Sequence, residues 1–320
     1  MNIIVRLSAG ILLLALFSVH LTGCQDSAQK HLNIARSRRD KGKFQEALEE
    51  YNAAVRIDPT DPHLLFERAV VRDSLNDLPG AIEDYSRVVR LFPNDTLTYL
   101  QRAFLEADLG RHDDALKDFD TVVGLAPDFP RGRLYRGCYL LLLDRYDSAR
   151  IDFDHAIRLD STNDLMYFYR GRAENNLARY QDAITDETRA ISLKPNLGLA
   201  FLERGKARLG LHDAQGAKND CDTALRLEPD SYLIYSIRSM AKSDLKDYAG
   251  AMSDCDSVLA HNRNFYPSYQ IRGEAREKLG DRSGGAVDIA LADSLKKVWG
   301  NKPIASAENS LKEFTDGNSK

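Results

Sequence analysis

The chain has 320 residues, of which 43% are hydrophobic and 29% are charged, so it can bury a sizeable core and stay in solution. Its formal net charge is −4, and this near-balance disfavours a nucleic-acid partner, which attracts clustered Lys and Arg. Ten Pro and 20 Gly are too few for a low-complexity or collagen-like chain.

Residues 1–23 have the features of a targeting segment. Arg6 precedes an apolar run from Leu7 to Val19, which is shorter than the roughly 20 apolar residues that span a bilayer. The run has the length of the hydrophobic part of a signal peptide. It ends in Leu21-Thr22-Gly23-Cys24, which resembles the lipobox of bacterial lipoproteins.

That resemblance implies that the signal peptide is removed before Cys24 and that this cysteine carries acyl chains of the palmitate type. Several chains on one residue give stable anchoring, whereas a single chain is marginal. Residues 24–27 are then the lipidated cysteine and a short tether. The alternative is an ordinary secretory signal, although no A-x-A-like cleavage site ends the run.

From residue 28 to residue 299 the sequence repeats every 34 residues without an insertion or a deletion. The copies begin at residues 28, 62, 96, 130, 164, 198, 232 and 266. The most regular position carries a small side chain: Ala47, Ala81, Ala115, Ala149, Ala183, Ala217, Ala251 and Gly285. A proline recurs twelve positions later in most copies, where it ends a helix: Pro59, Pro93, Pro127, Pro195 and Pro229.

This pattern resembles the tetratricopeptide repeat (TPR), in which a first helix (helix A) and a second helix (helix B) form a hairpin. Aromatic residues early in helix A carry the resemblance: Tyr99, Tyr167, Phe201, Tyr235 and Tyr269. So do aromatic residues in helix B: Tyr51, Tyr85, Phe119 and Phe153. The resemblance covers residues 28–299. It implies an all-α fold, a right-handed superhelical solenoid of eight repeats with a concave groove lined by the A helices.

Elementary packing supports the same architecture. Tyr99, Ala103 and Leu109 recur at helical spacing on one side of a predicted helix A, and Ala115 lies where two helices approach closely. A single hairpin cannot bury its apolar face, so neighbouring repeats must stack into a continuous core. Repeats 5 to 7 replace the helix B aromatic by Glu187, Cys221 and Cys255, which predicts differently filled packing there.

Seven repeats pair an Arg at position seven with an Asp at position twenty-three. These residues are Arg68, Asp84, Arg102, Asp118, Arg136, Asp152, Arg170, Asp186, Arg204, Asp220, Arg238, Asp254, Arg272 and Asp288. Both positions are equally far from a turn at position fifteen, so an antiparallel hairpin brings them together. A guanidinium can fork onto a carboxylate there. We therefore predict structural ion pairs; an anion-binding ladder of Arg side chains is the alternative.

Other candidate sites carry weaker signals. Asp-x-Asp pairs such as Asp118/Asp120 and Asp220/Asp222 lack the glycine-containing loop of a calcium site. Cys221 and Cys255 lie in stacked helices too far apart for a disulfide, which predicts free buried thiols. The histidines fall at scattered repeat positions, and no catalytic or phosphate-binding motif occurs. We therefore predict a non-enzymatic protein with no cofactor and no metal.

A row of apolar residues at position five of helix A indicates a partner-binding surface. The row consists of Leu32, Phe66, Leu100, Leu134, Phe168 and Leu202. Apolar neighbours on the same side are Leu97, Phe104, Leu141, Leu165, Leu199 and Leu209. Family geometry turns position five toward the groove, where Tyr135, Tyr169 and Arg172 would contribute. Burial of this row between repeats is the alternative.

Two terminal segments complete the chain. A basic stretch in repeat 1 (Arg36, Arg38, Arg39, Lys41 and Lys43) either meets anionic lipid near the anchor or forms a solvated end of the array. Residues 300–320 contain Ile304, Ala307, Leu311 and Phe314 at helical spacing, which predicts a short capping helix followed by a disordered tail over residues 315–320.

Together these features predict a lipid-anchored scaffold that binds a protein or peptide partner and meets the membrane through its lipid. Its expected location is the outer membrane, on the periplasmic face or the cell surface. A surface accessory protein that captures nutrients or glycans is the alternative scaffold function, and an enzyme is a third, less favoured one.

Overall fold

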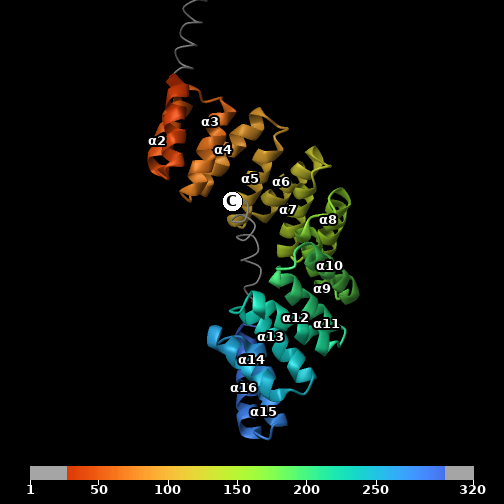
Figure 1. Cartoon of the computed structure of the whole chain (residues 1–320). Coiled ribbons are helices and arrows are strands. Elements are labelled where there is room, and N and C mark those ends of the chain that lie inside the picture. Colours follow the sequence, from red (N-terminus) through yellow and green to blue (C-terminus); the bar gives the residue numbers. More distant parts are fainter. Residues whose placement is uncertain (1–26, 300–320) are drawn as a thin grey trace, which may run out of the picture. The chain divides into compact units, whose positions relative to one another are not determined.

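The structure, a computed structural model, describes residues 27–299, and all regular elements within that range are α-helices (Figure 1). A helix over residues 27–40 comes first. The remaining helices are α2 (Phe44–Ile57), α3 (Pro62–Ser74), α4 (Leu78–Leu91), α5 (Thr96–Asp108), α6 (His112–Leu125), α7 (Pro130–Leu142), α8 (Tyr146–Leu159), α9 (Asp164–Asn176), α10 (Tyr180–Leu193), α11 (Gly198–Gly210), α12 (Ala214–Leu227), α13 (Tyr232–Asp244), α14 (Tyr248–His261), α15 (Tyr266–Lys278) and α16 (Arg282–Trp299). The signal segment, Cys24 and the predicted capping segment lie outside the described residues.

The helices alternate between two lengths within the 34-residue frame. From α3 to α15 each helix A has 13 residues, and from α2 to α14 each helix B has 14. Each helix packs against its partner in the hairpin, and successive A helices such as α9, α11 and α13 also contact one another. The predicted all-α array of helical hairpins is confirmed.

A left-handed residue turns the chain at position fifteen of each repeat. Its φ values lie between 57° and 97°, at Gly42, Asn76, Gly110, Asp144, Ala178, His212, Lys246 and Gly280. Such a residue is a common way to end a helix, and it favours glycine because a Cβ is strained there. The predicted turn at position fifteen is therefore confirmed in all eight repeats.

The core is built around two positions of helix B, one that carries a small residue and one that carries an aromatic residue. The alanines at position twenty are fully buried from Ala47 to Ala251, and Tyr51, Phe119 and Phe153 are fully buried at position twenty-four. On helix A, Gly137 is required because a Cβ at that residue would collide with the Phe153 ring. Close approach of the two helices thus depends on a small residue in one and a large residue in the other.

The repeats group into two compact units, which divide between Pro127 and Asp128. The first unit holds α2 to α6 and the preceding helix, and the second holds α7 to α16. The connection contains two prolines, Pro127 and Pro130, which remove backbone donors from this stretch of the chain. Each unit is described below by itself.

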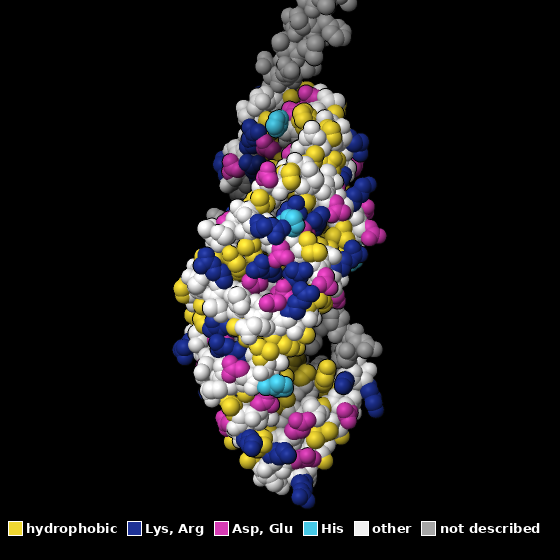
Figure 2. Space-filling model, turned by 90° about the vertical axis from the view of Figure 1, so that its right-hand side faces the viewer, with side chains coloured by type: hydrophobic (Ala, Val, Ile, Leu, Met, Phe, Trp, Pro, Cys, Tyr) yellow, Lys and Arg dark blue, Asp and Glu magenta, His cyan; other side chains and the backbone are white. Residues whose placement is uncertain are grey.

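Charges of both signs are interspersed on the face of the molecule that Figure 2 shows. On the face shown in Figure 2, Lys and Arg alternate with Asp and Glu, as the near-neutral composition leads one to expect. Between residues 27 and 299, no helix is both long enough and apolar enough to span a bilayer.

Candidate functional site

The seven Arg/Asp pairs are present as forked ion pairs between helix A and helix B of the same repeat. In each, Nε and Nη2 of the Arg donate to the two oxygens of the Asp sixteen residues later, at 2.6–2.9 Å. The seven Asp residues are at most 5% exposed. The predicted structural role is therefore confirmed. The guanidinium groups also lie over neighbouring rings, for example Arg238 over Tyr235 at 5.3 Å.

Six of these Arg residues have a described second partner, which the sequence did not lead us to predict. Nη1 of the Arg donates to the residue sixteen positions earlier, in helix B of the preceding repeat. These pairs are Arg68–Asn52, Arg102–Ser86, Arg170–Asp154, Arg204–Thr188, Arg238–Asp222 and Arg272–Asp256. The second Asp of an Asp-x-Asp pair therefore serves the next repeat's Arg. The sequence contains a clue to this second partner, because the residues at this repeat position are Asp, Asn, Ser or Thr, all of which accept hydrogen bonds.

The position-five row is part of the core, so the prediction that it is exposed along a groove is wrong. Leu32, Leu100, Leu134, Phe168 and Leu202 are buried, and Ser236 continues the row as a buried residue. Leu202 shows the reason: it packs against Cys221 and Ala224 of its own helix B and against Ile234 of the next helix A. Position five therefore points into the junction between one repeat and the next.

Several other residues predicted to face the groove are also enclosed, whereas Leu97 is 50% exposed. Tyr135 and Tyr169 are buried. Phe66 and Phe104 are half-buried, with ring centroids 5.3 Å from Tyr85 and 5.6 Å from Phe119. Among the predicted partner-binding residues, Arg172 lines the pocket described next.

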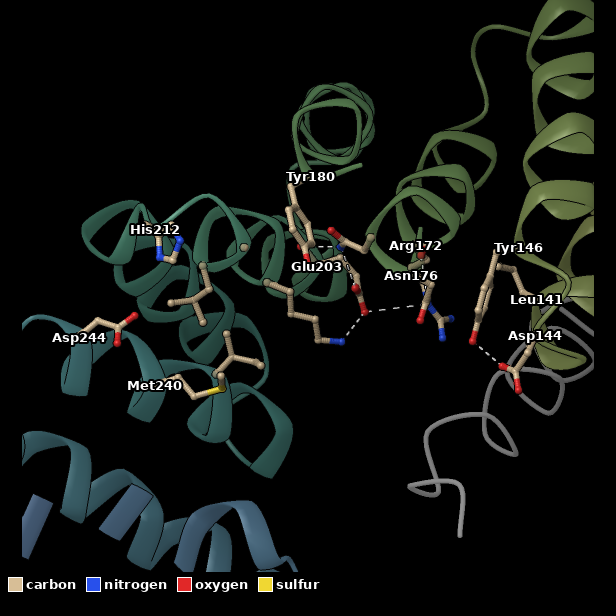
Figure 3. Close-up of a pocket in the computed structure, with 15 residues that line it drawn as sticks. Leu141, Asp144, Tyr146, Arg172, Asn176, Tyr180, Glu203, His212, Met240 and Asp244 are labelled. Carbon is tan, nitrogen blue, oxygen red and sulfur yellow. Dashed lines mark hydrogen bonds and ion pairs between the residues drawn. The ribbon is translucent and has the colours of Figure 1, made fainter. Parts of the chain in front are cut away.

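That pocket, of about 660 Å³, lies in the second unit (Figure 3). It is lined chiefly by four successive A helices, α7, α9, α11 and α13, at repeat positions six, nine, twelve and thirteen. The apolar lining residues are Leu141, Leu209, Ile237 and Met240. The polar ones include Asp144, Arg172, Asn175, Asn176, Glu203, Lys206, His212 and Asp244. Leu141 and Leu209 belong to the apolar neighbours of the position-five row that were predicted to face the groove.

Glu203 of α11 is the centre of the polar part of the pocket. Lys206 Nζ donates to its Oε1 at 2.7 Å, and Asn175 Nδ2 donates to its Oε2 at 3.2 Å. Arg172 Nε lies 3.9 Å from Oε1. Burial opposes ionisation of Glu203, but these positive charges and hydrogen bonds outweigh it, so the pKa of Glu203 is lowered. The carboxylate is therefore ionised and holds two cations on the pocket floor.

Two tyrosines at the start of B helices complete the lining. The Tyr146 hydroxyl donates to Asp144, and burial together with this bond raises the pKa of Tyr146 to about 12. The Tyr180 ring lies against Gly210 of α11, where a Cβ would collide with it. The pocket thus combines aromatic, apolar and charged groups within one opening.

The cysteines of the repeats offer no activated nucleophile. Cys138, Cys221 and Cys255 are free thiols, and the latter two are buried as predicted. Burial raises the pKa of Cys221 to about 12 and that of Cys255 to about 11, and it raises the pKa of Cys138 as well. Within residues 27–299, His, Cys, Asp and Glu side chains form no group suited to a metal ion.

The basic stretch of repeat 1 is paired with acidic residues of the first unit. Arg36 and Arg39 both bind Glu67 of α3, whereas Arg38 lies 3.1 Å from Glu50 and Lys43 lies 3.0 Å from Glu46. These contacts pair most of the basic side chains of this stretch with carboxylates of the same unit. They favour the solvated end of an array over a lipid-binding patch.

Comparison with known proteins agrees with this geometry. The model of the tetratricopeptide repeat matches residues 32–96 and 100–164. Among solved structures, a tetratricopeptide repeat protein from Parabacteroides merdae is 18% identical, with a TM-score of 0.60 over 84% of this chain and 99% of that chain. Among curated proteins, none matches the sequence.

Two further solved structures are similar at 17% identity. YrrB, described as a TPR protein with an unusual peptide-binding site, has a TM-score of 0.50 over 57% of this chain and 95% of that chain. PilW, described as a widely conserved type IV pilus biogenesis factor, has a TM-score of 0.56 over 64% of this chain and 94% of that chain. At these identities the likeness concerns the fold.

Proposed function

Since the chain belongs to the tetratricopeptide repeat family, whose members bind proteins or peptides, we propose that it is a scaffold that holds a partner peptide or helix in the pocket of α7, α9, α11 and α13. Proteins of this family are generally non-catalytic. The proposal rests chiefly on one observation. Four successive A helices present apolar and charged side chains to a single opening (Figure 3).

The chemistry of the lining suits a polypeptide. Leu209, Ile237 and Met240 can bury apolar side chains of a partner, each worth about 1.5–3 kcal/mol. Asn175 adds specificity, because its Oδ1 is buried without a hydrogen-bond partner while its Nδ2 binds Glu203. A backbone N–H of a partner would satisfy this acceptor. The peptide-binding site of YrrB motivates a peptide partner for this chain, and the role of PilW in type IV pilus biogenesis motivates an envelope setting.

A selection from a phage-displayed peptide library, with the purified chain as bait, tests the pocket. We expect enriched peptides whose binding is lost in Met240→Glu, since Met240 is 42% exposed and its replacement leaves the core intact. Ile151→Glu on α8 is the matched control, because Ile151 is 49% exposed and lies outside the pocket. Equal binding by both variants would place the peptide elsewhere.

We further propose that Cys24 anchors the protein in the outer membrane, on the periplasmic face or the cell surface. The lipobox-like sequence that ends at Cys24 supports this proposal. Cys24→Ala should leave the protein unprocessed or release it from the membrane fraction, with no incorporation of labelled palmitate. A mutant that is still labelled and membrane-bound would exclude the anchor while leaving the pocket proposal untouched.

Glycan capture is the second candidate. Tyr146 and Tyr180 line the pocket beside amides and carboxylates, which can stack on and hydrogen-bond to a sugar. A glycan array on the same purified chain separates the two proposals. Saturable glycan binding that Tyr180→Ala abolishes, without any peptide enrichment, would favour this second function.

A further inference from the structure

Glu187 of α10 occupies a position in the core that aromatic residues fill in the first four repeats. Tyr51, Tyr85, Phe119 and Phe153 are the equivalent residues. The Glu187 side chain is fully buried, and neither of its carboxyl oxygens has a hydrogen-bond partner. It lies against Gly171 of α9, leaving no room there for a Cβ. A carboxyl group without partners in such a place is stable only as the neutral acid.

The charges around Glu187 come from three helices. Asp186 lies beside it on α10 and is forked by Arg170 of α9. Arg172 comes from α9, and Glu203 and Lys206 come from α11. Of these groups, Glu203 and Asp186 oppose ionisation of Glu187, whereas Arg172 and Lys206 favour it. Burial is the largest influence and, with the two acids, raises the pKa of Glu187 well above its usual value.

The first unit shows how far a side chain at this position reaches. There Tyr51, the residue equivalent to Glu187, donates from Oη to Glu67 Oε2 at 2.7 Å. Glu67 occupies the same repeat position as Glu203. Arg36 and Arg39 of the preceding repeat hold Glu67, whereas Glu203 is held by Arg172, the equivalent of Arg36, and by Lys206 of its own helix. The position of Glu187 is therefore next to the cation-bound carboxylate of the following repeat. In the second unit an acid takes the place of the tyrosine.

We propose that Glu187 is a proton-controlled latch behind the pocket floor. While Glu187 is protonated, Arg172 and Lys206 stay on Glu203. When Glu187 loses its proton, a second carboxylate competes for the same two cations, and the floor rearranges. The latch itself is a property of this chain, whereas its regulation of peptide capture rests on the proposed function.

The direction of that regulation follows from linkage. A peptide that binds the floor as the structure shows it binds the state in which Glu187 holds its proton. Its affinity should therefore fall as pH rises through the raised pKa of Glu187, and its binding should raise that pKa further.

Carboxyl-carbon NMR of the full chain, labelled with ¹³C at the Glu side chains, tests the latch without any ligand. Over pH 4–10 we expect Glu187 to titrate well above the ordinary range of Glu. The Glu203 resonance should show a step at the same midpoint. Glu67 is the internal control: its neighbour is Tyr51, so it should show no such step. Circular dichroism at both ends of the range checks that the chain stays folded.

E187Q provides the second arm. The amide cannot ionise, so the high-pH step of Glu203 should vanish while its low-pH titration stays. The latch would be overturned if the Glu187 resonance titrated in the ordinary range of Glu, or if the Glu203 resonance showed no step at the Glu187 midpoint. A Glu203 step that survives in E187Q would also overturn it. If E187Q does not fold, the comparison of Glu203 with Glu67 in the unsubstituted chain still decides. A latch that titrates as expected in a chain that captures no peptide would refute the proposed function alone.

Discussion

The same Arg/Asp fork has different neighbouring charges in different repeats, as a comparison of Asp220 with Asp186 shows. Asp220 is forked by Arg204, and Arg208 Nη1 lies 3.0 Å from its Oδ2. Asp186 is forked by Arg170, and Glu174 replaces the second cation at the equivalent position. Removing one partner of a buried pair leaves an uncompensated charge, whereas removing both is often close to neutral.

We therefore expect Arg170→Met to destabilise the chain by about 3–5 kcal/mol, and Arg204→Met to cost distinctly less because Arg208 remains. The double variant Arg170→Met with Asp186→Leu should recover most of the loss, since Asp154 keeps its bond to Arg150. Urea unfolding followed by circular dichroism at pH 7 measures all three. Equal losses for the two single variants would show that Arg208 does not compensate.

The acid at position 187 predicts a pH-dependent stability. Because the pKa of Glu187 is raised in the folded chain, its stability contribution is complete below the ordinary pKa of 4.5 and is lost as pH rises through the folded pKa. Glu187→Phe should fit, because Phe153 lies over Gly137 in the same way. We expect the free energy of unfolding of this variant to exceed that of the unsubstituted chain by about 2 kcal/mol or more at pH 8, and this difference to shrink toward pH 4.5. Unfolding curves that keep the same gap at both pH values would contradict this.

At the scale of helices, the turn at position fifteen makes a local test possible. Ala178 adopts φ 57° there, a conformation that costs a residue with a Cβ roughly 1–2 kcal/mol. Ala178→Gly should therefore stabilise the α9–α10 hairpin by about 0.5–1 kcal/mol, the loss of chain entropy offsetting part of the gain. Gly110→Ala, at φ 69° with open space around it, is the reverse control and should destabilise by about 1 kcal/mol. Thermal melts of the two variants should move in opposite directions.

The helical hairpins, their turns and the Arg/Asp ion pairs could be predicted from the sequence because each depends on contacts inside one 34-residue repeat. The face of helix A that meets a partner could not, because it depends on how one repeat leans on the next. Leu202 and Met240 are both apolar, yet only Leu202 is enclosed by the neighbouring helices. The charged pocket residues Lys206 and Arg172 were the available clue, since two cations at position nine of adjacent helices are unsuited to a core.

At the scale of the whole molecule, the last described helix has an apolar side that no neighbouring repeat covers. Val287 and Val298 of α16 are 66% and 63% exposed, and Leu291 is 39% exposed. The predicted capping segment, residues 300–320, begins directly after this helix. We expect deletion of 300–320 to lower stability by about 2 kcal/mol and to increase binding of a hydrophobic dye. Deletion of 315–320 alone should change neither, and equal effects of both deletions would argue against a cap.

The Arg/Asp ladder also determines where the array can begin and end. Within each unit, an internal repeat offers an acceptor to its successor and a guanidinium to its predecessor, so a copy inserted between two such repeats would find both partners. Repeat 1 has Ile34 in place of the Arg, and repeat 8 has Ala290 in place of the acceptor. Neither end therefore leaves a buried charge unmatched. A repeat duplicated inside the array would therefore keep its ion pairs. A repeat added before repeat 1 or after repeat 8 would lack an Arg or an acceptor to pair with, so the array resembles a polymer whose two ends carry terminating units.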